Sequence, residues 1–222
     1  MEIQTLYFSF DSLQAALGLV IMTNLALLGA ESHRLCIRLI AFQGLLLGAL
    51  PFIVSTSPLD LHFIVVGALF LVIKAVVLPM LLRRTSRRLS SQSSRNPYVG
   101  YPFCVALGIG GLVLSIWVGT QLGTVENPVF SLVFPIGLFT VIAGLLLIVT
   151  RREILTQVFG YFVLENGIYL MGVPMAQQDM VWIELSVLLD ILVAAFVMVI
   201  AIHHINRAFA SVDVERMASL RD

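Results

Sequence analysis

The sequence predicts an all-α membrane protein: a polytopic bundle of about seven transmembrane helices, with its N-terminus outside and its C-terminus in the cytoplasm. Of the 222 residues, 59% are hydrophobic and 12% are charged, and the mean hydropathy is +1.00. A soluble domain carries about a quarter charged residues, so lipid must cover most of the surface of a chain this apolar. The spacing of the apolar stretches predicts the number of helices, and the one-sided distribution of the basic residues predicts their orientation.

Each predicted helix is a long apolar stretch, because a helix that crosses the bilayer needs about 20 mostly apolar residues. About seven stretches meet this criterion: 11–30, 35–54, 61–82, 102–121, 129–150, 154–173 and 181–203. The breaks between them carry turn-forming residues, namely "ESHR" at 31–34, "STSPLD" at 55–60, "GTVENP" at 123–128 and "GVPMAQQD" at 172–179.

The basic residues set the predicted orientation. If every stretch crosses, all the lysines and arginines except Lys74 fall on one side of the membrane: Arg34, Arg38, Arg83, Arg84, Arg87, Arg88, Arg95, Arg151, Arg152, Arg207, Arg216 and Arg221. The connections on the other side hold no Lys or Arg, and their charged residues are acidic: Glu2, Asp11, Asp60, Glu126 and Asp179. Because loops rich in Lys and Arg stay in the cytoplasm, the N-terminus is predicted outside. It has no basic segment typical of a cleaved signal peptide.

The same pattern predicts four segments. Residues 1–101 form a three-helix membrane unit followed by a basic loop, 102–128 a connecting helix, 129–207 a second three-helix unit and 208–222 a cytoplasmic tail. Both units run in the same direction, and the third helix of each carries one ionisable residue at membrane depth. The basic loop is either a solvated segment held near anionic lipid head groups or a docking surface for a cytoplasmic partner.

Three ionisable residues are predicted to lie inside the bilayer. With a helical rise of about 1.5 Å per residue, Glu165 and Asp190 lie roughly 20 Å from the inner boundary and Lys74 roughly 14 Å, in a hydrocarbon core about 30 Å thick. Each charge at such a depth costs about 2.5–3.5 kcal/mol, and such residues usually mark ion or proton paths. The alternative is a static pairing that locks helices together.

A row of polar residues surrounds Glu165 on its helix. Gln157, Tyr161, Glu165 and Tyr169 recur every four residues, with Glu153 one turn earlier, so that they share a helix face. Such a row is either hydrogen-bonded contact between helices or a proton relay in which donors and acceptors alternate with water. The length of the row favours the relay, since a static clamp needs only one or two such groups.

Other ionisable residues are candidates for the places where protons enter and leave the proposed relay. Glu184 is near the outer end of the last stretch, and His203 and His204 lie at its cytoplasmic end, where histidine binds and releases protons near neutral pH. These residues are candidate entrances and exits, although each is also an ordinary interfacial residue. Gln43, the nearest polar group in the N-terminal half, is a further candidate entrance or exit.

The residues that cofactor chemistry requires are missing from the sequence. No phosphate-binding glycine loop, nucleophile triad or metal-ligand cluster is present. Cys36 and Cys104 are far apart and form no CxxC pair, which argues against an iron–sulfur, nickel or structural zinc site built from this chain alone. No catalytic residue, bound cofactor or nucleic-acid partner is therefore expected. The glycines of the apolar stretches predict close helix packing.

Three segments resemble the hydrogenase-4 component E family: "RREILTQVFGYFVLENGIYL" at 151–170, "IELSVLLDILVAAFVMVIAIHHINRAF" at 183–209 and "VIKAVVLPMLLRR" at 72–84. The resemblance covers nearly the whole chain. It implies a non-catalytic subunit of a hydrogenase or formate hydrogenlyase-like complex in the cell inner membrane, related to complex I. The implied partners are antiporter-like and quinone-oxidoreductase-H-like membrane subunits and a cytoplasmic hydrogenase-like arm, which carries the nickel–iron and iron–sulfur centres.

The last three stretches also resemble the K subunit of NADH–quinone oxidoreductase and the C subunit of multisubunit cation/proton antiporters. In a subunit of this kind, a basic pair opens the middle helix, one glutamate lies near the centre of that helix and a second glutamate lies in the next helix. The matching residues here are Arg151 and Arg152, Glu165, and Asp190 in place of the second glutamate. The position of the N-terminal half that matches Glu165 is apolar, so that half is expected to be structural.

Together these patterns predict a membrane subunit that translocates protons or sodium ions through Glu165, Asp190, Lys74, Tyr161 and Gln157. A scaffold that only anchors its neighbours and a stand-alone cation/proton transporter are the alternatives. The sequence leaves open which ion moves and which redox partner drives it.

Overall fold

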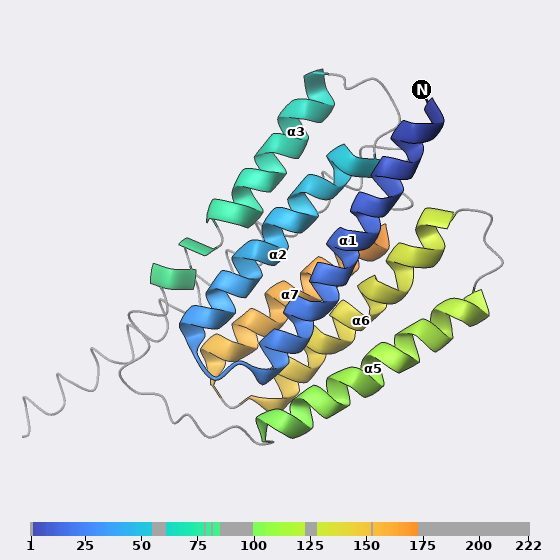
Figure 1. Ribbon diagram of the computed structural model, residues 1–222. Helices are drawn as coiled ribbons and strands as arrows, with labels where there is room; N and C mark the ends of the chain where they lie inside the picture. Colours follow the sequence, from blue (N-terminus) through green and yellow to red (C-terminus); the bar gives the residue numbers. More distant parts are fainter. Residues whose placement is uncertain are drawn as a thin grey trace, which may run out of the picture.

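The computed structural model describes residues 2–54, 61–77, 79–80, 82–84, 100–122, 128–151 and 153–172. The helices in these ranges are α1 (Glu2–Gly29), α2 (His33–Val54), α3 (Leu61–Val72), α5 (Tyr101–Leu122), α6 (Pro128–Thr150) and α7 (Ile154–Gly172), and a π-helical turn, η1 (Ile73–Val77), follows α3 (Figure 1). The described ranges contain helices and no strand, which confirms the all-α class for them. Within the described ranges, four segments are long and apolar enough to span a membrane: Asp11–Gly29, His33–Leu50, Tyr101–Leu122 and Phe130–Thr150.

The predicted stretches agree with the helices except at two points. Helix α1 begins at Glu2 rather than at residue 11, because the hydropathy criterion finds the most apolar part of a helix and not the preceding turns, which here mix polar and apolar residues. The stretch at 61–82 is not one regular helix, since α3 ends at Val72 and η1 follows. Pro79 explains the change: proline has no N–H to donate, and its ring displaces the carbonyl one turn earlier. The stretch at 181–203 lies outside the described residues.

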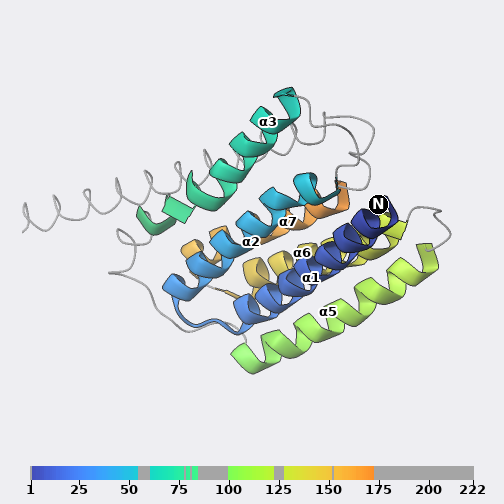
Figure 2. The same ribbon diagram turned by 45° about the horizontal axis from the view of Figure 1, so that its top comes forward.

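The helices run antiparallel to their chain neighbours and pack as an inner group with two flanking helices. Helices α1, α2, α6 and α7 form the inner group, in which α6 and α7 make the most extensive contact. Helix α5 packs on α6 and α1, whereas α3 packs on α2. Viewed from another direction, α3 and α5 lie at opposite edges of the bundle (Figure 2). Lys74 lies on η1, which packs on α2 of the inner group.

Glycines allow α6 and α7 to approach closely. A Cβ added at Gly144 would lie 2.5 Å from the Leu164 nitrogen and 2.7 Å from the Gly160 oxygen, and one added at Gly167 would lie 2.5 Å from the Val141 nitrogen. Side chains cannot occupy such positions unless the helices separate. The predicted glycine packing is thus confirmed for this pair of helices. Gly110 on α5 has open space where its Cβ would be, so it packs closely against none of the described helices, and a contact with another subunit there stays a prediction.

We expect Gly160→Leu to lower the stability of the bundle by about 1–3 kcal/mol or more, because overpacking forces the backbones apart. The measurement is the thermal unfolding temperature of the purified chain in detergent. The matched control is Gly110→Leu, which places the same side chain in open space. Equal unfolding temperatures for the two variants would contradict the close contact.

The interior consists of two apolar clusters with a polar layer between them. On α1, α2 and α7, one cluster contains Leu27, Ile40 and Val163 and the other contains Val20, Leu47 and Tyr169. On each of these helices, buried amide or carboxylate side chains lie between the two clusters: Asn24 on α1, Gln43 on α2, and Glu165 and Asn166 on α7. The apolar clusters therefore separate this layer from both ends of the helices.

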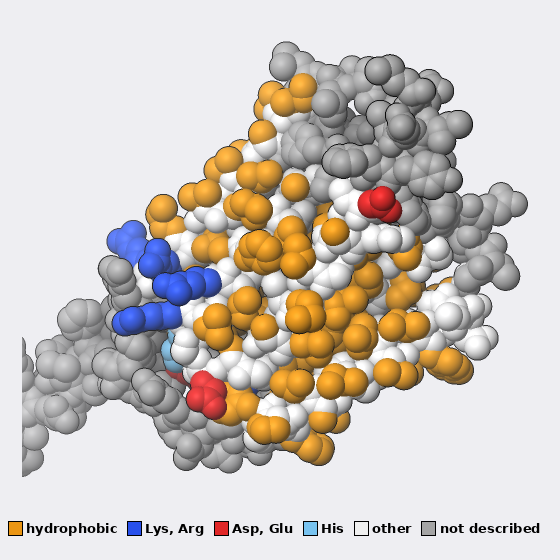
Figure 3. All heavy atoms as spheres, in the orientation of Figure 1, with side chains coloured by type: hydrophobic (Ala, Val, Ile, Leu, Met, Phe, Trp, Pro, Cys, Tyr) orange, Lys and Arg blue, Asp and Glu red, His pale blue; other side chains and the backbone are white. Residues whose placement is uncertain are grey.

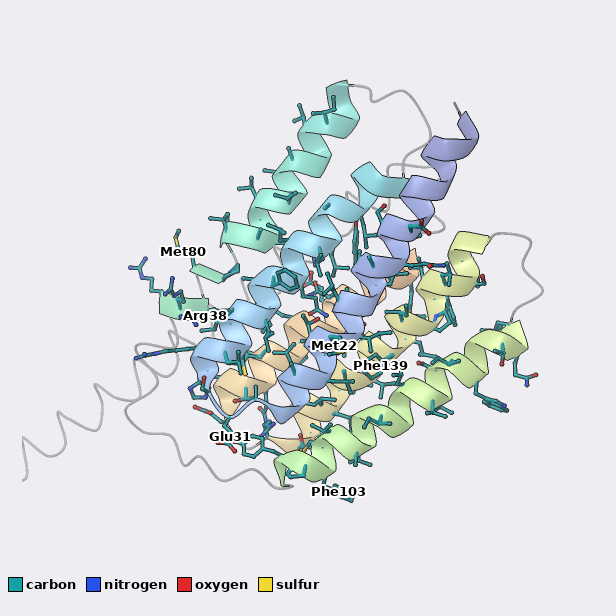
Figure 4. The ribbon with its side chains drawn as sticks, viewed as in Figure 1. Met22, Glu31, Arg38, Met80, Phe103 and Phe139 are labelled. Atoms are coloured by element: carbon teal, nitrogen blue, oxygen red, sulfur yellow. The ribbon has the colours of Figure 1, made fainter. Side chains whose placement is uncertain are left out.

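The outer surface of the bundle is apolar, and its exposed basic residues gather at one end. Met22 is 66% exposed and Phe103 59% exposed, and both project outward, whereas Phe139 is buried between the helices (Figure 4). Among the described residues, the exposed Lys and Arg side chains are Arg34, Arg38, Arg83 and Arg84. Figure 3 shows the blue side chains together at one end of an orange surface. This charge segregation agrees with the sequence-based prediction for the described part of the chain.

Candidate functional site

Lys74 lies on the π-helical turn, at the closest approach of that turn to α2. A Cβ added at Gly44 would lie 2.8 Å from the Lys74 carbonyl oxygen, so glycine is needed there for α2 to approach. A π-helical turn is uncommon and often occurs at functional sites. The backbone of Lys74 is thus held against α2 while its side chain, 2% exposed, extends into the bundle.

Lys74 and Glu165 form a buried ion pair. The Lys74 Nζ is 2.7 Å from Glu165 Oε1, and the two side chains are 2% and 3% exposed. Nζ also donates to Asn166 Oδ1 at 2.8 Å and lies 5.6 Å from the centroid of the Tyr169 ring. The structure therefore brings together two of the three ionisable residues that the sequence places at membrane depth. Their role in ion relay stays a prediction.

One oxygen of Glu165 has no hydrogen bond within the described part of the chain. Glu165 Oε2 is buried and has no hydrogen-bond partner among the residues that the structure describes. A buried carboxylate oxygen without a donor is energetically unfavourable. A proton bound at this oxygen would remove the carboxylate charge and weaken the attraction to Lys74. Oε2 is therefore the atom of the pair at which a hydrogen-bond donor or a proton would bind.

A chain of amide side chains continues from Lys74 across the bundle. Asn166 Nδ2 donates to Gln43 Oε1 at 3.2 Å, and Gln43 Nε2 donates to Asn24 Oδ1 at 2.9 Å. Asn24 Nδ2 donates to Thr140 Oγ1 at 2.9 Å, and that hydroxyl donates to the Ile136 carbonyl at 2.7 Å. We call Asn166, Gln43 and Asn24 the amide chain. It links the π-helical turn with α7, α2, α1 and α6.

The other residues of the predicted relay are not arranged as one buried row. Gln157 donates to the Arg151 carbonyl at 3.0 Å, at the start of α7. Tyr161 is 40% exposed, in contrast to the buried Glu165 one turn away. Gln43, predicted as an entrance, is fully buried within the amide chain. Asp190, Glu184, His203 and His204 lie outside the described residues, so their predicted roles stay predictions.

A second polar cluster lies where α1 ends and α7 begins. Arg151 is buried; its Nη2 donates to the Leu28 carbonyl at 2.8 Å, and its guanidinium lies 4.1 Å from the centroid of the Tyr101 ring. Because the last carbonyls of a helix lack partners within it and carry partial negative charge, Arg151 stabilises the C-terminus of α1. Glu153 Oε2 lies 2.5 Å from His33 Nε2. Arg152 lies outside the described residues.

Sequence reasoning missed four residues of these two clusters: Asn24, Thr140, Asn166 and His33. Three of them carried a usable signal, since an asparagine or threonine in the middle of an apolar stretch needs a hydrogen-bond partner there. His33 carried none, because a histidine in a turn is common. Its contact with Glu153 joins residues far apart in sequence and depends on how the helices pack.

Comparison with known proteins adds relatives that match almost end to end. The chain is 27% identical over 207 residues to hydrogenase-4 component E of Escherichia coli (strain K12), covering 92% of this chain and 94% of that protein. The resemblance to the hydrogenase-4 component E family is confirmed. Hydrogenase-4 component E of Shigella flexneri matches to the same extent. Uncharacterized protein Rv0085 of Mycobacterium tuberculosis is 27% identical over 209 residues, or 93% of this chain.

The similarity to component E includes both halves of the chain, since the match spans 92% of it. No protein-family model matches the chain, and no solved structure matches it. The narrower resemblance of the C-terminal half to the K subunit and to the antiporter C subunit stays a prediction.

Proposed function

We propose that this chain is a non-catalytic integral membrane subunit of a hydrogenase or formate hydrogenlyase-like energy-converting complex, and that it takes part in proton translocation at the Lys74–Glu165 pair. The buried pair, with one carboxylate oxygen lacking a hydrogen bond among the described residues, carries the proposal. Similarity to hydrogenase-4 component E supports the assignment to a hydrogenase complex. The apolar outer surface supports a place in the membrane.

An apolar contact would hold these helices together at least as well as the ion pair does. Burying two charges requires desolvation that their attraction scarcely offsets, and replacing such a pair by apolar residues is often neutral or stabilising. Helix packing alone therefore gives no reason for a lysine and a glutamate at this depth. Proton exchange gives one, since ionisable residues inside membrane helices usually line ion or proton paths.

In the proposed mechanism Glu165 is the exchanging group. A proton added at Oε2 makes the carboxyl neutral, and loss of that proton restores the ion pair with Lys74. Asp190 is proposed as the second carboxylate, with Gln157 and Tyr161 on the path along α7. Glu184, His203 and His204 are the proposed entrances and exits. A sodium ion in place of the proton remains the alternative cargo.

The proposal includes seven spans in the inner membrane, with the N-terminus outside and the C-terminus cytoplasmic. The exposed arginines at one end of the bundle support this orientation, because basic residues remain on the cytoplasmic side. The proposed neighbours are antiporter-like and quinone-oxidoreductase-H-like membrane subunits and a cytoplasmic hydrogenase-like arm. The nickel–iron and iron–sulfur centres are proposed to lie on that arm and not on this chain.

A double variant separates translocation from the scaffold alternative. We expect Lys74→Met with Glu165→Leu to assemble with its partners, because two apolar side chains replace the buried charges and the remaining cost is one acceptor, Asn166 Oδ1, that loses its donor, yet to move no protons. The measurement is proton uptake by inverted membrane vesicles that contain the complex, with assembly followed by co-purification. Uptake equal to that of the wild type would show that the pair only holds helices together.

A further inference from the structure

The hydrogen bonds of the amide chain all point in one direction. A lysine ammonium has three donors and no acceptor, so Asn166 must turn its oxygen toward Lys74 and its Nδ2 toward Gln43. The same constraint passes to Gln43 and then to Asn24, which donates to Thr140. The chain ends at the Ile136 carbonyl, which only accepts. Both ends therefore dictate the orientation of every amide between them.

This one-way order favours a positive charge at Lys74. Each amide turns its oxygen, the negative end of its dipole, toward the side on which the ammonium lies. Asn24, Gln43 and Asn166 are 0%, 0% and 4% exposed, and the apolar clusters lie on both sides of them. In surroundings of low dielectric constant, aligned hydrogen bonds strengthen one another. Lys74 is thus stabilised by the amide chain as well as by Glu165.

The amide chain does not itself conduct protons. A side-chain amide donates only through its NH₂ group and accepts only through its oxygen. Passing a proton through it would require an imidic acid intermediate, whereas a hydroxyl, a carboxyl or water can accept one proton and release another. The amide chain therefore offers protons no route to the ion pair.

We propose that Asn166, supported by Gln43 and Asn24, is a positioning residue that holds the Lys74 ammonium at Glu165 and keeps the lysine charged. This inference rests on the proposed function, in which Glu165 exchanges the proton. Without the amide chain, Lys74 transfers a proton to Glu165: an N–H bond breaks, an O–H bond forms at the carboxyl, and a neutral amine and a neutral acid result.

Infrared spectroscopy of the purified full chain in lipid nanodiscs tests this inference. In the wild type at neutral pH we expect no protonated-carboxyl band from Glu165. In Asn166→Leu we expect such a band, because losing a hydrogen bond to a charged group shifts the equilibrium about 10- to 100-fold toward the neutral pair. Adding Glu165→Gln to this variant assigns the band by removing it. Gln43→Met, which breaks the chain one link further away, is expected to give a weaker band.

The matched control is Thr23→Val. Thr23 is buried next to Asn24 in sequence, but its hydroxyl donates to Val20 of its own helix and takes no part in the chain. Its spectrum should equal that of the wild type. The inference is overturned if neither Asn166→Leu nor Gln43→Met shows the band, or if Thr23→Val shows it equally. Since no proton movement is measured, this failure is distinct from failure of the proposed function.

Discussion

Replacing Glu165 by glutamine is expected to leave the complex assembled and to reduce coupled proton movement by roughly 100-fold or more, the scale on which a positioned acid–base group contributes. Glutamine keeps the shape of the side chain and an oxygen that can accept from Lys74, but it cannot bind and release a proton. The measurement is proton uptake by inverted membrane vesicles, together with co-purification of the subunits.

Two further variants make this result specific. Glu165→Asp keeps an exchangeable proton but shortens the side chain by one methylene, so that partial proton movement is expected. Asp11→Asn removes a carboxylate that is exposed near the start of α1, and proton movement should be unchanged. Normal proton uptake by the Glu165→Gln complex would refute the relay assignment.

Replacing Lys74 by methionine is expected to destabilise the chain by about 3–5 kcal/mol, the usual cost of leaving one partner of a buried ion pair alone. Glu165 would then be buried without a cation, and Asn166 Oδ1 would lose the donor that orients the amide chain. Lower thermal stability in detergent and less protein in the membrane are the expected observations.

Val76→Met is the matched control for this variant. Val76 lies on the same π-helical turn and is 49% exposed, so methionine there should leave the unfolding temperature nearly unchanged. Restoration of stability when Glu165→Leu is added to Lys74→Met would identify the unpaired carboxylate as the cause. Equal unfolding temperatures of Lys74→Met and Val76→Met would show that the pair contributes little to stability.

The sequence predicts the Lys74–Glu165 pair better than it predicts the amide chain. Lys74 and Glu165 were predictable one by one, because a charged side chain in an apolar stretch is costly and needs a partner. Their mutual contact was not, since 91 residues separate them and many helix arrangements would satisfy the hydropathy pattern. The amide chain was less visible still, because asparagine, glutamine and threonine are neutral and their effect depends on which neighbours they meet.

The sequence by itself determined the helical class, the apolar stretches, the separation of basic from acidic ends and the family resemblance. These properties are local or compositional, because a stretch of about twenty apolar residues predicts a membrane-spanning helix whatever the rest of the chain does. Only the tertiary structure decided that α3 changes to a π-helical turn at Lys74, that glycines bring α6 and α7 into contact, and that five helical elements share one hydrogen-bond chain. Such features depend on packing between distant segments, and hydrogen bonds form only where that packing brings a donor within about 3 Å of an acceptor.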